Sequence, residues 1–384
     1  MNILFCNYEY PPLGGGGGVI NAQVAEELAK RHNVTVLTSQ GFDLQAHEVV
    51  NNVEVIRVPV LLRNQKAAAS FVSMFSYLPM GAKHGANLLR KEKFDVINTH
   101  FVLPTGPVGD YLAGKFDLPN VLSVHGGDLY DPSKFSSPHR HFILRQWVKR
   151  LLRKADYIVG QSENTLDNVR KYYDDSLPLE KIPLGINRPP REAGTRSDYG
   201  IKGDDIVLVT VGRLVARKAV DQLLEIVSDV HRQDVHLIVV GSGPQEQTLR
   251  EKASELQIDK QVHFLANVDD AEKFRVLNMS DIFVSTAQHE GFGLVFLEGM
   301  ATEMPVICYD NGGQTDFLTH DETGGVIPLN NKQKFTEYLQ SLVDDKEKRL
   351  AIAKANLEFV ENYYIDRCAE RYETLFEQAI EKAK

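Results

Sequence analysis

Short apolar runs alternate with amphipathic segments along most of the chain. A continuous apolar run of strand length predicts a buried strand, whereas apolar residues every three or four positions predict a helix. In the first half, this alternation predicts helices such as 20–31 and 139–154, and a parallel sheet covered on both faces. The predicted strands of this half are residues 2–6, 34–37, 53–58, 95–97, 121–124 and 157–159.

A polar segment separates this pattern from a second one. Residues 185–202 contain Pro189, Pro190 and Gly194, which is typical of a linker. The strands predicted beyond it are 206–211, 237–240, 262–264, 282–284 and 306–308. We therefore expect an α/β fold with two Rossmann-like doubly wound parallel-sheet domains facing across a cleft, residues 1–185 and 186–365. A helix at 366–384 should pack back on the first domain. The length of 384 residues also favours two domains.

Composition narrows the class of protein. The net charge of -9 argues against nucleic-acid binding, which requires a basic face. Cys6, Cys308 and Cys368 are too few and too scattered for a disulfide framework or a zinc site. No run approaches the roughly 18 apolar residues of a membrane-spanning helix, and no charged leader precedes the first predicted strand. We expect a cytoplasmic protein with no nucleic-acid partner and no bound metal.

Two carboxylates flank a glycine-containing turn in the second domain. Glu290 follows the predicted strand 282–284, and Glu298 lies among apolar positions of a predicted helix at 294–301. In open α/β sheets, ligands bind where a strand end meets a helix start. A buried glutamate needs a partner, and a ligand hydroxyl would serve. Taken alone, either residue is better explained as a partly exposed glutamate beside a tight turn.

Two cations follow the first strand of this domain. Arg213 comes directly after the strand 206–211, and we expect Lys218 to begin the next helix, with Arg217 facing solvent. Arginine offers planar bidentate donors and lysine a compact charge, which together suit a pyrophosphate. The alternative is a solvated basic turn. The shared sheet edge with Glu290 and Glu298 favours a binding role.

The first domain carries a glycine run and a histidine at the corresponding edge. Residues 14–18 are all glycine and precede a helix expected to start at Val19, so their amides suit a phosphate. A flexible loop explains the glycines equally well. His125 ends the strand 121–124 and can bond a substrate hydroxyl near neutral pH, although a plain turn histidine remains an alternative.

A basic amphipathic helix is predicted at 139–154. It could rest on an anionic membrane surface, which would place the protein at the inner face of the membrane. A core-packed helix with a solvated basic face is the interpretation we favour. The segment 71–93 shows a similar combination of apolar and basic residues.

Several motifs together resemble glycosyltransferase family 4, of the GT-B fold, and they span nearly the whole chain. They are the glycine loop after Pro11-Pro12-Leu13, Gly212-Arg213-Leu214 with Lys218, Gly241-Ser242-Gly243-Pro244, Glu290-Gly291-Phe292-Gly293-Leu294 through Glu298, and Asn311-Gly312-Gly313. The resemblance implies a retaining, metal-independent transfer of a hexose or N-acetylhexosamine from a nucleotide diphosphate sugar. The acceptor would be a hydroxyl group of a sugar, of a lipid-linked molecule or of a small molecule. The reaction would belong to cell-surface polysaccharide or glycolipid synthesis. We expect a UDP-sugar donor and no separate cofactor.

The resemblance also implies residue roles. Four residues would carry the chemistry: His125 at the transferred sugar, Glu290 at a sugar hydroxyl, and Arg213 and Lys218 at the donor diphosphate. The donor would further be bound by Glu298 at the ribose, by backbone at Gly243, Phe292, Gly293 and Leu294, and by Gly16 and Gly17 at the phosphates. Ala219 departs from the pattern because glycine is common there, and we expect its small size to be tolerated.

Two other classes of function stay open. A nucleotide-sugar isomerase or epimerase of the same fold would need no acceptor, and a nucleotide-sugar-binding protein would need no turnover. A dinucleotide oxidoreductase is disfavoured because Thr38-Ser39-Gln40 stands where an acidic residue would bind the ribose.

Overall fold

The chain divides into two compact units. The computed structural model describes residues 1–66, 69–131, 135 and 137–384. Unit 1 comprises Met1–Gly185 together with Ile365–Lys384, and unit 2 comprises Ile186–Tyr364. The chain therefore passes between the units at 185–186 and again at 364–365, close to the boundaries expected from the linker and the final helix.

Unit 1 is built on an eight-stranded sheet with strand order β3-β4-β2-β1-β5-β6-β7-β8. All neighbours pair in parallel except β3, which is antiparallel to β4. The parallel strands agree with the prediction from apolar runs, and their carboxyl ends share one edge. The strands are β1 (Asn2–Asn7), β2 (Asn33–Ser39), β3 (His47–Val50), β4 (Val53–Val58), β5 (Val96–His100), β6 (Asn120–Val124), β7 (Tyr157–Gly160) and β8 (Leu179–Lys181).

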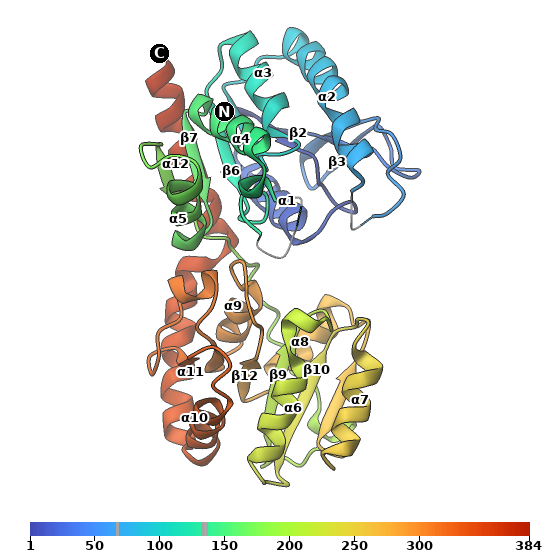
Figure 1. Cartoon of the computed structure of the whole chain (residues 1–384), viewed down its shortest axis with the longest axis vertical. Coiled ribbons are helices and arrows are strands. Elements are labelled where there is room, and N and C mark those ends of the chain that lie inside the picture. Colours follow the sequence, from blue (N-terminus) through green and yellow to red (C-terminus); the bar gives the residue numbers. More distant parts are fainter. Residues whose placement is uncertain (67–68, 132–134, 136) are drawn as a thin grey trace. The chain divides into compact units, whose positions relative to one another are not determined.

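Helices cover both faces of this sheet (Figure 1). Successive side chains of a strand point to opposite faces. Accordingly, Leu4 of β1 packs with residues of α2 and α3, whereas the Phe5 ring meets Phe376 of α12 at 6.5 Å between centroids. The α12 helix is thus an integral part of unit 1. The helices are α1 (Gly16–Leu28), α2 (Phe71–Lys91), α3 (Gly106–Phe116), α4 (Phe142–Lys154), α5 (Glu163–Tyr172) and α12 (Ile365–Ala383).

Unit 2 contains a six-stranded, wholly parallel sheet with order β11-β10-β9-β12-β13-β14. Its central strands are buried on both faces, as expected for a sheet with helices on each side. The strands are β9 (Ile206–Val211), β10 (Val235–Val240), β11 (Val262–Leu265), β12 (Ile282–Ser285), β13 (Val306–Tyr309) and β14 (Gly324–Ile327). The helices are α6 (Val220–Asp229), α7 (Glu246–Glu255), α8 (Asp270–Asn278), α9 (Leu294–Ala301), α10 (Lys332–Asp344) and α11 (Lys346–Val360).

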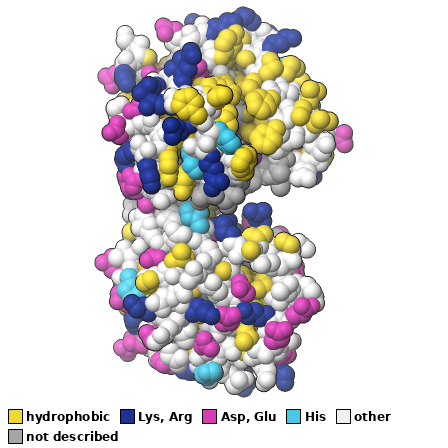
Figure 2. Space-filling view, in the orientation of Figure 1, with side chains coloured by type: hydrophobic (Ala, Val, Ile, Leu, Met, Phe, Trp, Pro, Cys, Tyr) yellow, Lys and Arg dark blue, Asp and Glu magenta, His cyan; other side chains and the backbone are white. Residues whose placement is uncertain are grey.

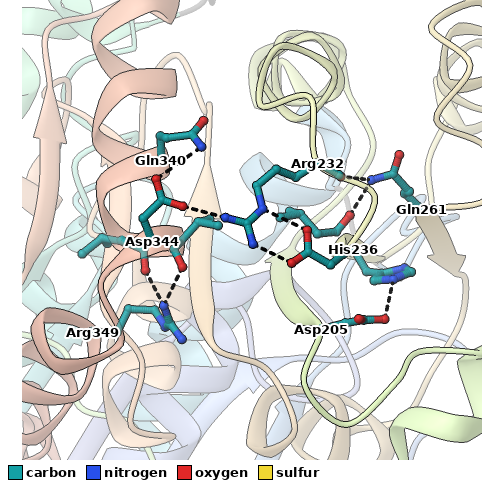
Figure 3. Close-up of polar contacts among 11 residues, drawn as sticks. Asp205, Arg232, His236, Gln261, Gln340, Asp344 and Arg349 are labelled. Atoms are coloured by element: carbon teal, nitrogen blue, oxygen red, sulfur yellow. Dashed lines mark hydrogen bonds and ion pairs between the residues drawn. The ribbon is translucent and has the colours of Figure 1, made fainter.

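A polar network fixes the amino edge of the unit 2 sheet (Figure 3). The Arg232 guanidinium contacts Asp234 and Asp344 at 2.6 Å each, which joins the end of α10 to the segment before β10. Gln261 donates to the carbonyls of Arg232 and Val235 at 2.7 Å each. These bonds satisfy buried backbone groups at the edge opposite the predicted site.

Some elements differ from the sequence prediction. Strands β3, β8 and β14 were not predicted, because they are short edge or glycine-containing strands without a continuous apolar run. The α1 helix begins at Gly16, three residues before the expected Val19. The α4 helix begins at Phe142, because residues 138–140 form a separate 3-10 turn.

Candidate functional site

The carboxyl edge of the unit 2 sheet brings together two turns that are far apart in the sequence. Strands β9 and β12 are neighbours, so the turns that follow them meet. The Lys218 ammonium donates to Glu290 Oε1, 72 residues away in the chain. A small cavity at this edge is lined in part by Gly212, Arg213 and Lys218. The structure therefore places Arg213, Lys218 and Glu290 at one location, as their strand-end positions predicted.

Lys218 does not begin the next helix, contrary to the prediction. It closes a 3-10 turn at Ala216–Lys218, and α6 starts at Val220. Ala219 between them has a φ of 45°, in the left-handed region that glycine adopts most readily. The backbone at this position, rather than the size of the side chain alone, explains why glycine is common there in the family that the chain resembles.

We expect from the sequence that Arg217 faces solvent, but in the structure its side chain also contacts the turn that contains Glu290. Its side chain is 45% exposed, but Nη1 lies 3.6 Å from Glu290 Oε2 and also donates to the His289 carbonyl. Arg213 differs because it is exposed and its side chain forms no hydrogen bond or ion pair within the described ranges. A planar bidentate donor therefore remains open to an anion at this edge.

Glu290 is positioned by the turn after β13. Its carbonyl accepts from Gly313 N–H at 2.9 Å, and its backbone forms a parallel bridge with Gly312. Gly312 has a φ of 136°, and a Cβ there would lie 2.1 Å from the Glu290 carbonyl oxygen. Only glycine permits this approach. The Asn311-Gly312-Gly313 motif therefore holds Glu290 in place.

The start of α9 presents backbone amides to the same edge. Gly293 precedes the helix with a φ of 93°, and no side chain caps the first turn. The Phe292 side chain is buried against Phe317, with ring centroids 5.2 Å apart. Phe292 can therefore offer a ligand its backbone only. Uncapped amides at a helix start suit a phosphate.

Glu298 is held by a lysine that the sequence analysis missed. Its side chain is 16% exposed, and Oε1 lies 2.9 Å from Lys273 Nζ of α8. Oε2 is buried and lacks a hydrogen-bond partner among the described residues. Burial raises the pKa of Glu298, and the Lys273 charge partly offsets this. An acceptor of this kind is suited to a ligand hydroxyl. Lys273 lies 25 residues before Glu298 in the sequence, so no local pattern indicates that the two side chains pair.

Gly243 has a structural reason to be glycine. A Cβ there would lie 2.3 Å from the Leu214 carbonyl oxygen. The turn that contains Gly243 is joined to the turn after β9 by a bond of 2.9 Å from Leu214 N–H to the Ser242 carbonyl. This backbone packing supports the walls of the site. The predicted contact of Gly243 with a nucleotide stays a prediction.

In unit 1, the glycine run and His125 lie close together. A Cβ at Gly17 would lie 3.8 Å from His125 Nδ1 and 2.8 Å from the Phe101 ring. The α1 helix starts at Gly16 without a side-chain cap, while the Gly15 amide already donates to Glu9 at 3.0 Å. Gly16 and Gly17 thus lie in a first helical turn, where amides are open to an anion.

His125 is a neutral, pre-positioned group. Its Nε2 lies 3.3 Å from His100 Nδ1, and its backbone N–H donates to Asp128 at 2.9 Å. Burial lowers the pKa of His125 to about 4 and holds the pKa of His100 well below 6.5. His100 is the last residue of β5 and His125 directly follows β6, so both histidines lie at a strand end, and this similarity could have identified His100 from the sequence. The arrangement suits hydrogen bonding better than proton storage near neutral pH.

Apolar and basic side chains gather on the surface of unit 1. Phe142 and Ile143 of α4 are 70% and 81% exposed, and Phe71 of α2 is 64% exposed. Figure 2 shows hydrophobic side chains on this unit with Lys and Arg side chains nearby. A cavity of about 360 Å³ beneath them is lined by residues of α2 and α4 and by Gly127 and Asp128. No helix of the described residues is long and apolar enough to cross a membrane.

Comparisons with known proteins agree with this architecture. Sequence models for "Glycosyl transferases group 1" and "Glycosyltransferase Family 4" match residues 193–359 and 14–188. A GDP-mannose-dependent monoacylated alpha-(1-6)-phosphatidylinositol monomannoside mannosyltransferase of Corynebacterium glutamicum is 30% identical, over 92% of this chain and 91% of its own. An N-acetyl-alpha-D-glucosaminyl L-malate synthase of Bacillus anthracis is 24% identical, over 96% and 94%.

Solved structures share the fold across nearly the whole chain. Sucrose-phosphate synthase from Thermosynechococcus elongatus superposes with a TM-score of 0.81 at 21% identity, covering 98% of both chains. HepE of Anabaena in complex with UDP gives 0.79 at 18% identity, covering 98% of this chain and all of that one. Two α/β units of this kind form the GT-B fold, and the matching family models and relative make the chain a glycosyltransferase. The chain belongs to glycosyltransferase family 4.

Proposed function

We propose that this protein is a retaining, metal-independent glycosyltransferase. It transfers a hexose or N-acetylhexosamine from a nucleotide diphosphate sugar to an acceptor hydroxyl. Unit 2 binds the donor, and unit 1 provides the acceptor side with His125. The observation that carries the proposal is the grouping of Arg213, Lys218 and Glu290 at the edge where α9 begins.

Each group at this edge suits one part of the donor. Arg213 and Lys218 would bind the diphosphate, helped by the amides at the start of α9. Lys218 is paired with Glu290, so the diphosphate would share or replace that contact. Glu298 Oε2 would accept a ribose hydroxyl. Glu290 would then be available to a sugar hydroxyl.

The chemistry follows from charge stabilisation and positioning. The bond from the anomeric carbon to the phosphate oxygen breaks, and its electron pair stays on the departing diphosphate. Arg213, Lys218 and the helix amides stabilise that charge. The acceptor oxygen bonds to the anomeric carbon from the face just vacated, and its proton passes to the departing phosphate oxygen. Glu290 and Glu298 recognise the donor and do not attack it.

The donor that we propose to test first is a UDP-sugar. Structures of HepE are described with UDP and with UDP-glucose, whereas the C. glutamicum relative is named as GDP-mannose-dependent. Both nucleotides therefore belong in the experiment. Metal independence is part of the proposal and is tested with a chelator. The described residues include no group of three His, Cys, Asp or Glu side chains placed to hold a metal ion.

The acceptor that we propose belongs to cell-surface polysaccharide or glycolipid synthesis. Relatives are named for phosphatidylinositol mannoside and for diacylglycerol products. The exposed apolar side chains of α2 and α4 support contact with an amphiphilic acceptor or a membrane surface. The protein would act in the cytoplasm at the inner face of the membrane.

Product analysis separates transfer from isomerisation. With donor alone, a transferase releases only slow hydrolysis products, and turnover rises when a crude glycolipid acceptor is added. An isomer of the donor sugar formed without acceptor would favour the epimerase alternative. Activity retained in excess chelator supports metal independence, and loss restored only by a divalent ion would contradict it.

Arg213→Ala or Lys218→Ala should each weaken UDP binding by more than tenfold, about 1.4 kcal/mol, because each removes a charged donor from the diphosphate. Calorimetric titration of UDP measures this, with GDP as the second arm. Lys260→Ala is the matched control, since Lys260 is an exposed lysine of the same unit. Unchanged affinity in both variants would rule out the diphosphate assignment.

A further inference from the structure

The loop after β4 buries an arginine while it exposes the leucines beside it. Leu61 and Leu62 are 63% and 61% exposed, whereas Arg63 is 7% exposed. This reverses the usual distribution of leucine and arginine between interior and solvent. Leu62 also has a φ of 52°, a left-handed conformation that is unfavourable for a residue with a side chain. Strain of this kind tends to persist at binding sites.

The Arg63 guanidinium has no hydrogen-bond partner among the described residues. Nε, Nη1 and Nη2 are all buried, and none of them bonds to a residue in the described part of the chain. The head lies 4.7 Å from the centroid of the Tyr8 ring, a cation–π contact that leaves the N–H donors unused. Nearby Arg57 differs, because it forms an ion pair with Glu48 at 2.7 Å. A buried cation without an acceptor is costly unless a ligand supplies one.

Arg63 lies on the same sheet edge as His125. Tyr8 directly follows β1, and the Arg63 loop is joined to the glycine run by a bond of 2.8 Å from Gly14 N–H to the Lys66 carbonyl. In the sheet, β1 is two strands from β6, which His125 follows. With strands about 4.8 Å apart, the backbone turns after β1 and β6 lie on the order of 10 Å apart, so Tyr8, which Arg63 contacts, and His125 belong to one region of this edge.

The side chain is held in place before any ligand arrives. Its Cδ packs close to Gly41, where an added Cβ would lie 3.2 Å away. The Tyr8 ring beneath it is fixed by a contact of 2.6 Å between its hydroxyl and Ser73 Oγ. A planar donor that is already immobilised binds an oxyanion with little further loss of entropy.

We propose that Arg63 is the binding group for an anionic part of the acceptor, a phosphate ester or a carboxylate, while the acceptor hydroxyl lies near His125. The inference rests on the proposed function, in which unit 1 binds the acceptor. It narrows the acceptor to molecules that carry an anionic group in addition to the reacting hydroxyl.

Calorimetric titration of anions into full-length protein tests this. The Lys218→Ala variant is the background, so that the donor edge of unit 2 does not dominate phosphate binding. Inorganic phosphate represents a phosphate ester, and succinate represents a carboxylate. We expect at least one anion to bind, and Arg63→Gln in the same background to weaken it by tenfold or more. Arg90→Gln, which removes an exposed arginine of α2, should leave binding unchanged.

The tighter of the two anions identifies the chemistry of the acceptor group. Equal binding with and without Arg63, or no binding of either anion, would overturn the inference. UDP binding to the wild-type protein is measured separately and decides the proposed function independently of Arg63.

Unfolding of the unliganded protein provides a second readout. If Arg63 serves ligand binding and not folding, the Arg63→Met variant should unfold at the wild-type temperature or above it. The reason is that the substitution removes an unpaired buried charge. A clearly lower unfolding temperature would show that Arg63 stabilises the fold, and would overturn the binding role. Scanning fluorimetry in phosphate-free buffer measures this.

Discussion

Glu298 shows how a single side chain can be prepared for one ligand group. One carboxylate oxygen is neutralised by Lys273, and the other is buried without a partner. The ion pair favours the charged form that accepts hydrogen bonds, while burial strengthens any bond formed there. Ribose hydroxyls are therefore a natural occupant of this position in a nucleotide-sugar transferase.

Glu298→Ala should remove the preference for UDP over 2′,3′-dideoxy-UDP. Hydrogen bonds to a charged group contribute about 1.5–3 kcal/mol, so the wild-type preference should be at least tenfold. Competition binding of the two nucleotides measures the ratio. Glu303→Ala changes an exposed glutamate of the same unit and should keep the preference. An equal preference in wild type and Glu298→Ala would place the ribose elsewhere.

His125 predicts an acid sensitivity of unit 1. Its pKa is lowered from 6.5 to about 4 in the folded protein, so the unfolded chain binds more protons between these values. Its contribution to stability is complete above pH 6.5 and is lost as the pH falls toward 4, with a slope of up to about 1.4 kcal/mol per pH unit.

Unfolding temperatures measured from pH 7 to pH 4 test this. The His125→Asn variant should lose less stability than wild type over the same interval. His231→Asn, an exposed histidine of unit 2, is the control and should follow wild type. A parallel pH profile for wild type and His125→Asn would contradict the role of burial.

At the residue scale, the sequence located most of the site but not its pairings. Arg213, Lys218 and Glu290 could be placed on one edge because each follows a parallel strand. Their ion pairs could not be predicted, because Lys218 and Glu290 are 72 residues apart in the sequence. The packing of the sheet determines which of these side chains come into contact. Arg63 could not be predicted as a buried residue, because a single arginine in a polar loop belongs to no periodic pattern.

At the element scale, continuous apolar runs identified every central strand, because burial on both faces requires them. Strand β3 escaped because its residues alternate between exposed and half-buried. Strand β14 begins with Gly324 and Gly325, which do not resemble a strand. The start of α1 was misplaced because glycines are poor helix formers, yet tertiary packing carries the helix back to Gly16.

The α4 helix has features of both structures that its basic amphipathic pattern predicts, a core-packed helix and a helix with an apolar surface for a membrane. Val148, Leu151 and Leu152 are buried, and Arg153 and Lys154 pair with Asp174 and Asp110. The other end exposes Phe142 and Ile143. The favoured prediction of a core-packed helix therefore describes its second half, while its first half keeps an apolar surface.

Replacing Phe142 and Ile143 together with serine should reduce sedimentation with vesicles rich in anionic lipid, because apolar insertion and basic attraction act together. Vesicles of zwitterionic lipid should bind the wild type less. Leu350→Ser alters a comparably exposed leucine of unit 2 and serves as the control. Failure of wild-type protein to sediment with either vesicle would exclude membrane contact through α4.

At the scale of the whole molecule, α12 makes unit 1 discontinuous in sequence. Its Tyr372 hydroxyl lies 3.0 Å from Ser123 Oγ of β6, and Glu373 pairs with Arg31 at 2.6 Å. Leu375 and Phe376 are buried in the same unit. This helix covers a sheet face that would otherwise be exposed to water.

A chain that ends at Tyr364 should therefore retain UDP binding in unit 2 but lose a folded unit 1. Each deleted large apolar side chain costs about 2–5 kcal/mol, and several together exceed the usual stability of a domain. Limited proteolysis with and without UDP measures this. Removal of exposed residues 381–384 alone should have no effect. A protease-resistant unit 1 in the shorter chain would contradict this expectation.

The position of α12 also sets the order in which the protein can be completed during synthesis. The ribosome makes residues 1–185, then all of unit 2, and only afterwards the helix that unit 1 lacks. Unit 2 is continuous in sequence, so its core can form before Phe376 has been synthesised and can pack against Phe5. The unit that begins first is therefore the one that is finished last.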